Sequence, residues 1–263
     1  MRIQFSLSCQ KGTIIPINYQ SEISNWIFAV LANAGAELSM WVQQQGFDLS
    51  SRTYKLFTFR PLAIYPYEMD QVRQEFKLLG NQVKVGISFY LNPAFEQQLV
   101  NLFRQVPLQL GTLEGQPAYF EVKHWQVVSR PPFKETMQFK AVSPISVTTV
   151  EEGKPANPYV LPDNPDYDTS FFHHIIRRFK AAHQYRSLAQ MKLLDPAFPM
   201  QYRVLGQAKS RLIHLKANYD GIQQLRGFTY EFEISAPIPV LEFCYYAGFG
   251  EFPHLGFGYV DLK

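Results

Sequence analysis

The order of the predicted secondary-structure elements repeats along the chain, and this repeat constrains the fold more than any single motif. Hydrophobic periodicity predicts strand, helix, strand, strand, helix, strand in each half. The elements of the first half are expected over residues 2–9, 23–31, 54–60, 82–91, 92–103 and 117–128. Those of the second half are expected over residues 137–149, 168–179, 201–217, 226–235, 238–245 and 255–262. This order is typical of a ferredoxin-like domain, so the sequence predicts an α+β protein with tandem ferredoxin-like (RRM-like) domains.

A proline-containing break in the hydrophobic pattern predicts the boundary between the two domains. Arg130-Pro131-Pro132 interrupts the periodic pattern between the halves, because proline fixes its own backbone and lacks an amide donor. We therefore expect domains over residues 1–130 and 131–263. A further short helix in the first half, with Leu38, Trp41 and Val42 inward, is expected to end at Gly46.

Composition excludes several classes of protein. Of 263 residues, 46% are apolar and 18% are charged, which is incompatible with disorder. The most apolar stretch, residues 26–36, is too short to span a membrane. Two cysteines, Cys9 and Cys244, supply neither a disulfide framework nor a zinc cluster. We expect a reduced, soluble, cytoplasmic protein that contacts no membrane.

Charge is distributed unevenly along the chain. The formal net charge is only +3, yet residues 170–230 contain ten lysines and arginines against two aspartates. A polyanion bound to such a segment releases counterions, which is the main sequence-independent contribution to nucleic-acid affinity. An ordinary solvated face would have the same composition, so charge alone leaves both interpretations open.

A glycine-rich segment near the carboxyl end is the sharpest local motif. Its sequence, GFGEFPHLGFG over residues 248–258, contains two Gly-Phe-Gly units eight residues apart. It lacks the Gly-Lys-Ser/Thr of a P-loop, and Pro253 occupies the third glycine position of a dinucleotide fingerprint. Paired glycines allow another backbone to approach closely, and in a basic protein that backbone could be RNA. The alternative is a turn with a glycine bulge.

This terminal segment, in a duplicated ferredoxin-like chain of this length, resembles the CRISPR-associated repeat-RNA endoribonucleases of the repeat-associated mysterious protein (RAMP) superfamily. The strand Lys55-Leu56-Phe57-Thr58-Phe59 carries the same resemblance, and residues 15–19 and 142–147 support it. The resemblance implies recognition of a CRISPR repeat in a precursor CRISPR RNA and a single cut. It also implies that the 2′-hydroxyl attacks the adjacent phosphate, leaving a 2′,3′-cyclic phosphate, with no metal and no cofactor.

The sequence departs from the family at two catalytic positions. Many members carry a histidine three residues before the glycine that ends the second short helix, where this chain has Gln43. A tyrosine sometimes found in the first helix falls at Phe28. Lys55 is retained, and we expect it against the scissile phosphate, either catalytic or simply positioning. His173, His174 and His254 are candidates for a substitute base. The alternative function is a repeat-RNA-binding protein that no longer cleaves.

The residues expected to contact RNA come from the second half of the chain. They are Lys140, Arg203, Lys209, Arg211, Gly248, Gly250, Gly256 and Gly258. Arg177 and Arg178 are reserve candidates. We expect the glycine segment to be a flexible, solvent-facing ribbon that holds the RNA strand. Association with subunits of a CRISPR effector complex, or with a second copy of the chain, stays open.

Overall fold

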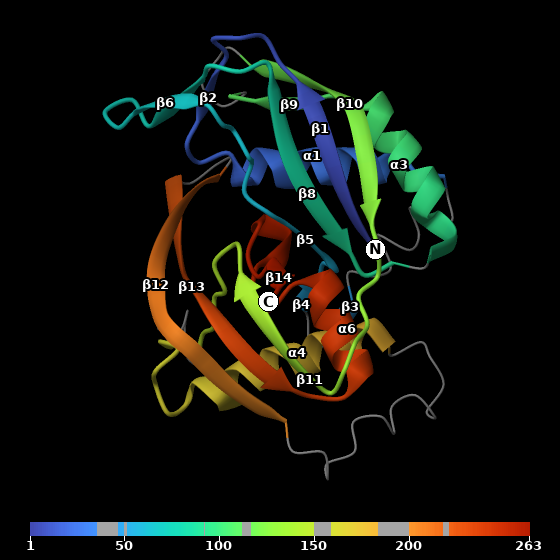
Figure 1. The fold of residues 1–263 in the computed structure, drawn as a ribbon, viewed down its shortest axis with the longest axis vertical. Coiled ribbons are helices and arrows are strands. Elements are labelled where there is room, and N and C mark those ends of the chain that lie inside the picture. Colours follow the sequence, from blue (N-terminus) through green and yellow to red (C-terminus); the bar gives the residue numbers. More distant parts are fainter. Residues whose placement is uncertain are drawn as a thin grey trace.

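A computed structural model describes residues 1–35, 47–49, 52–91, 93–111, 117–149, 159–183, 200–217 and 221–263. Each half of the chain builds its own antiparallel sheet, and the two sheets follow one another along the long axis of the molecule (Figure 1). The predicted second short helix, together with Gln43, lies outside the described residues.

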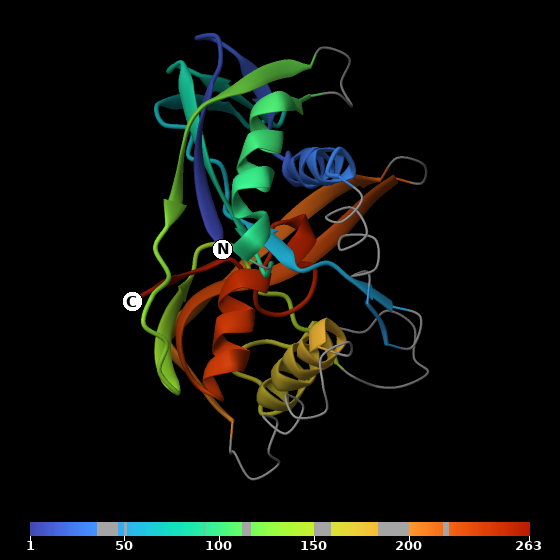
Figure 2. The same ribbon diagram turned by 90° about the vertical axis from the view of Figure 1, so that its right-hand side faces the viewer.

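The first half forms a five-stranded sheet in the order β5-β8-β1-β10-β9. Its strands are β1 (Arg2–Ser8), β5 (Phe57–Phe59), β8 (Gln82–Phe89), β9 (Leu108–Leu110) and β10 (Ala118–Val128). Its helices are α1 (Gln20–Ala32) and α3 (Glu96–Gln105), the latter preceded by the single turn η1 (Pro93–Phe95). Both helices lie on the same side of the sheet (Figure 2). Ile3, Phe5 and Leu7 alternate along β1 and are buried, so the period-two pattern places one face of the sheet in the core.

The second half forms a four-stranded sheet in the order β12-β13-β11-β14. Its strands are β11 (Thr136–Ala141), β12 (Gln201–Ala217), β13 (Gly221–Ser235) and β14 (Val260–Leu262). Its helices are α4 (Tyr167–His183) and α6 (Ile238–Ala247), and a short turn, η3 (Pro253–Leu255), precedes β14. Phe139 and Phe232 pair across β11 and β13 and are fully buried beneath the helices. Burial of one such side chain contributes roughly 2–3 kcal/mol.

Strand order confirms the predicted fold class. In each half the four main strands and two helices follow the sequence β-α-β-β-α-β, and the strands lie in the order second, third, first, fourth. That order is the ferredoxin-like arrangement, found here twice in tandem. Two large apolar clusters accompany the two sheets, although Leu56 of the first half packs into the cluster of the second. The boundary between domains at residue 130 stays a prediction.

Several predicted strands are shorter in the structure, including 54–60, of which β5 covers only Phe57–Phe59, and the strands predicted over 137–149 and 255–262 are shortened most. The strand predicted over 137–149 ends at Ala141, because Val142 and Ser143 both donate to the carbonyl of Tyr259 and Pro144 has no amide to donate. The strand predicted over 255–262 begins only at Val260, because Gly256 and Gly258 adopt positive φ angles of 80° and 70°. Positive φ is incompatible with an extended strand.

Two small sheets were not predicted. The first has the order β2-β7-β6 and consists of β2 (Ile14–Pro16), β6 (Tyr67–Asp70) and β7 (Glu75–Leu78). The second pairs β3 (Phe47–Leu49) with β4 (Arg52–Tyr54). Among the described residues, no helix has both the length and the hydrophobicity needed to cross a membrane.

Candidate functional site

The glycine segment, Gly248–Gly258, lies between the two halves and is mostly buried. Seven of its residues are buried, and the other four are half-buried. The expected solvent-facing ribbon is therefore wrong as a description of this segment. Its backbone is bound by protein: Glu251 N donates to the Ser146 carbonyl at 2.8 Å, and Gly258 N donates to that of Pro144 at 2.8 Å.

Each glycine of the two Gly-Phe-Gly units occupies a position that a side chain could not fill. All four have positive φ angles, between 69° and 87°. A β-carbon on Gly258 would lie 2.0 Å from the Phe249 carbonyl oxygen, and one on Gly250 would lie 2.4 Å from that of Ser146. Gly248 and Gly256 face Thr58 and the ring of Phe59 in the same way. Protein packing thus accounts for the residue type at all four positions, while direct contact of these glycines with RNA stays a prediction.

Arg178 holds the beginning of the glycine segment from α4. Its side chain is 3% exposed, and its guanidinium donates hydrogen bonds to three backbone carbonyls. Nη2 reaches the carbonyl of Ala247 at 2.6 Å, and Nη1 reaches those of Gly248 at 2.7 Å and Gly250 at 3.1 Å. The planar fork of arginine suits such convergent acceptors. The reserve prediction of Arg178 as an RNA contact is wrong, because the side chain is buried against the segment.

A second polar group holds the middle of the segment. His174 Nε2 lies 3.0 Å from the Thr148 carbonyl, and its Nδ1 lies 3.5 Å from Glu251 Oε1. The Thr148 hydroxyl donates to the other oxygen of Glu251 at 2.6 Å. Burial lowers the pKa of His174, opposed by the nearby Glu251 carboxylate. Both ring nitrogens therefore have protein partners, which makes His174 a structural residue.

Residues of the first-half sheet form hydrogen bonds with the glycine segment and with the residues on either side of it. Thr58 Oγ1 donates to the Phe257 carbonyl at 2.7 Å, and Ser88 Oγ donates to that of Tyr246 at 2.8 Å. Arg2, 2% exposed, donates to the carbonyls of Val260 and Tyr245 at 2.6 and 2.5 Å, and its guanidinium lies 3.3 Å from the centre of the Tyr245 ring. These contacts join residues from opposite ends of the chain. They fix the glycine segment relative to both sheets.

The turn η3, in which His254 and Leu255 are half-buried, lies against the first half of the chain. It packs against β5 and against α1. Lys55 lies two residues before β5, half-buried, with its ammonium 5.6 Å from the centre of the Phe28 ring on α1. Burial lowers the pKa of Lys55. His254 lies in η3, where burial first, and then the positive charges of Arg178 and Lys55, lower its pKa to about 4.

The predicted basic residues share one face of the second sheet. Strand register places Lys140 opposite Glu231, Arg203 opposite Glu233, and Lys209 opposite Thr229. Glu231, Glu233 and Thr229 alternate with the buried residues of β13, so all of these side chains lie on the face away from Phe232. We call Lys140, Arg203, Lys209 and Arg211 the basic face; all four are exposed.

The members of the basic face differ in their neighbours. Arg203 Nη2 forms an ion pair with Glu233 at 2.9 Å. In the part of the chain that the structure describes, neither Lys209 nor Arg211 has an acidic partner within 4.0 Å. Their positive charges are therefore available to an anion.

The hairpin of β12 and β13 connects the basic face to the glycine segment. Beyond Arg211 the same face continues to Leu215 and Leu225, which are buried against Phe257. Ile213 and Leu255 complete this contact. Leu215 is six positions after Lys209 on β12, about 20 Å of strand. The face of β12 that carries the exposed cations Lys209 and Arg211 therefore continues to the residues that pack against η3, the turn that contains His254.

The carboxyl half of the chain decides the family. Residues 128–262 match the family model described as CRISPR-associated protein Cas6, C-terminal. The chain belongs to the Cas6 family. No curated protein sequence matches it at a significant level.

Solved structures share the Cas6 fold along the whole chain. A Cas6-related protein from Pyrococcus furiosus superposes with a TM-score of 0.77 at 20% identity, covering 100% of this chain and 98% of the other. A RAMP protein described as binding different RNA substrates gives 0.76 at 19% identity, with 100% and 99% coverage. A Cas6 product complex gives 0.61 at 15% identity, with 100% and 98% coverage. At these identities the likeness establishes the fold.

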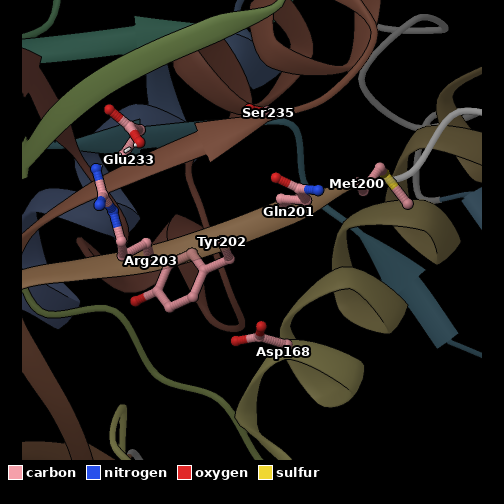
Figure 3. A pocket seen from close by; sticks show the side chains of 7 residues that line it. All are labelled: Asp168, Met200, Gln201, Tyr202, Arg203, Glu233 and Ser235. Carbon is pink, nitrogen blue, oxygen red and sulfur yellow. Dashed lines mark hydrogen bonds and ion pairs between the residues drawn. The ribbon is translucent and has the colours of Figure 1, made fainter.

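A polar pocket lies at the other end of the hairpin in this Cas6-family chain. It has a volume of about 520 Å³ and lies between the start of α4 and the paired ends of β12 and β13 (Figure 3). Its lining residues are Asp168, Met200, Gln201, Tyr202, Arg203, Glu233 and Ser235. Gln201 pairs with Ser235 here, fourteen residues along β12 from Leu215, so the pocket is separate from the turn that contains His254.

Sequence reasoning missed the anchoring role of the residues that hold the Cas6 glycine segment in place, although it named Arg178 as a reserve RNA contact and His174 as a candidate base. Arg2 and Arg178 are buried cations that donate to backbone carbonyls, and no local motif distinguishes them from exposed arginines. In the described residues, no cluster of three or more histidine, cysteine, aspartate or glutamate side chains could hold a metal ion.

Proposed function

We propose that this Cas6-family protein binds a CRISPR repeat in a precursor CRISPR RNA and cuts it once without a metal. The observation that carries the proposal is the packing of the turn η3 of the glycine segment against β5, which begins two residues after Lys55. Family membership supports the substrate class, and the packing of η3 against β5 supports a site of reaction beside Lys55.

The basic face accounts for RNA binding. Lys209 and Arg211 project on one side of an extended strand with about 7 Å between alternate residues, close to the spacing of successive phosphates in a nucleic-acid strand. Each phosphate neutralised releases counterions, so this surface favours RNA irrespective of its sequence. Lys140 and Arg203 lie further along the same face, beside acidic residues that lower their net attraction for phosphate.

Lys55 supplies positive charge at the scissile phosphate. The reaction forms a bond between the 2′-oxygen and phosphorus and breaks the bond from phosphorus to the 5′-oxygen of the next nucleotide. Negative charge accumulates on the phosphate oxygens in the transition state, and a half-buried ammonium stabilises it more than an exposed one would. Phe28 presents its ring to Lys55 and so contributes to holding the ammonium in place.

The proposal is tested by incubating excess protein with labelled RNA that carries the repeat of the adjacent CRISPR array, with and without EDTA. We expect one cut, with a 2′,3′-cyclic phosphate and a 5′-hydroxyl, at the same rate in both conditions. Lys55→Ala is expected to slow the cut by about 10²–10³-fold. Lys11→Ala, which removes an exposed lysine at the far end of β1, is the matched control and is expected to cleave normally.

Intact RNA after a single-turnover incubation would overturn the cleavage proposal. Tight, salt-sensitive binding of the repeat without any product would then identify a non-cleaving RNA-binding protein. Absence of both binding and cleavage would overturn the assignment of the RNA surface as well.

A further inference from the structure

We propose that His254 accepts the proton of the attacking 2′-hydroxyl, the role for which this sequence has Gln43 in place of the family's usual histidine. This inference rests on the proposed function and adds a catalytic residue to it. An amide such as Gln43 does not exchange protons near pH 7, so the reaction needs another acceptor or proceeds without one.

The turn that carries His254 has a defined backbone conformation and packs against the first half of the chain. Phe252 and Gly256, on either side of η3, adopt left-handed conformations with φ angles of 58° and 80°. Gly256 packs on the ring of Phe59, and η3 contacts both β5 and α1. The turn of His254 therefore packs against the helix that carries Phe28 and against the strand that begins two residues after Lys55.

Two other histidines, His174 and His124, are less suited to this role. His174 has protein partners at both ring nitrogens. His124 lies exposed on β10, in the outer part of the first-half sheet. Of the residues that the structure describes, none forms a hydrogen bond with the ring of His254, which is half-buried and so partly open to solvent.

The protonation state of His254 suits a general base. The charged groups that act on it are Arg178 from α4 and Lys55 ahead of β5, and with burial they lower its pKa to about 4. The imidazole is therefore neutral at pH 7 and has a free lone pair. A scissile phosphate placed beside Lys55 brings a negative charge that opposes the two cations. The pKa of His254 then rises toward neutrality, where a histidine is the more effective base.

The proton transfers balance as follows. His254 takes the proton of the 2′-hydroxyl while the 2′-oxygen bonds to phosphorus. The 5′-oxygen leaves with the electron pair of its bond to phosphorus and takes a proton from the Lys55 ammonium. The imidazolium and the neutral amine then return to their starting states by exchange with water, so the reaction consumes no net proton.

The test compares His254→Gln with the wild-type protein under single-turnover conditions between pH 5.5 and 8.5. We expect a rate loss of about 10²–10⁴-fold and loss of the rising limb of the pH profile. Affinity for the same repeat with a 2′-deoxy nucleotide at the cut, which cannot react, is expected to stay unchanged. His124→Gln is the matched control and is expected to keep both the rate and the profile.

A second variant separates chemistry from folding. His254→Ala opens space beside η3, and added imidazole is expected to restore cleavage in proportion to its concentration. Wild-type rates in His254→Gln would overturn the role of His254 while leaving the proposed function intact. A slow variant with an unchanged pH profile and no rescue by imidazole would also overturn it, because a structural role predicts that result. Failure of the wild-type protein itself to cleave would overturn both proposals.

Discussion

Arg178 and Gly248 are joined by a hydrogen bond of 2.7 Å from a buried guanidinium to a backbone carbonyl. The same guanidinium also binds the carbonyls of Ala247 and Gly250. A helix of the second domain thus fixes the start of a segment that turns away from regular structure. The geometry of η3, and with it the position of His254, depends on this anchor.

Replacement of Arg178 is expected to weaken both folding and cleavage. Arg178→Ala removes three charge-assisted hydrogen bonds and leaves buried carbonyls unpaired, which costs about 3 kcal/mol. Arg178→Lys keeps the charge but cannot reach all three acceptors, so we expect a smaller loss. Urea denaturation gives the free energies of unfolding. Equal stability of Arg178→Ala and wild type would contradict the anchoring role.

Gly258 is expected to tolerate no side chain. A β-carbon there would lie 2.0 Å from a backbone oxygen, so Gly258→Ala forces the segment apart and costs more than about 3 kcal/mol. Gly12 has a φ of 87° but open space around it, so Gly12→Ala measures the backbone cost alone, about 1 kcal/mol. Thermal denaturation of the two variants tests this difference. Similar losses in both would show that contact with Phe249 is unimportant.

Lys209 and Arg211 are expected to carry much of the salt dependence of RNA binding. Their replacement by alanine together should reduce the slope of log affinity against log salt by about 1.4–1.8, as two lost phosphate contacts require. Arg73→Ala with Lys77→Ala removes the same charge from the β6–β7 hairpin and should leave the slope unchanged. Fluorescence anisotropy with repeat RNA at several salt concentrations measures both. If the two double variants had the same slope of log affinity against log salt, Lys209 and Arg211 would not belong to the RNA-binding surface.

His254 is expected to make the free energy of unfolding fall at acid pH. Its pKa is about 4 in the folded protein and about 6.5 in the unfolded chain, so the unfolded chain binds the proton first as pH falls. Between pH 7 and pH 4 the wild type should therefore lose about 3 kcal/mol more than His254→Gln. Urea titrations at both pH values measure this difference. Parallel loss in the two proteins would show that His254 is not held in its neutral form.

Local sequence patterns were sufficient for the regular elements. Alternation along β1 and helical spacing along α1 predict their burial because each pattern is a property of one element alone. The long hairpin of β12 and β13 was predicted for the same reason. The sheet of β2, β6 and β7 was not, because its short strands gain their pairing only from residues distant in sequence.

For the functional site too, some features were predicted from the sequence and others became known only from the tertiary structure. Lys55, His254 and the basic residues of β12 were identified as candidates from their chemistry and their neighbours in the sequence. The order of elements also determined the tandem ferredoxin-like fold. Only the tertiary structure showed that the glycine segment is buried, that Arg178 is its anchor, and that η3 packs against β5, which begins two residues after Lys55. Contacts of this kind depend on how two sheets pack together, and packing between distant segments leaves no periodic signal in the sequence of either one.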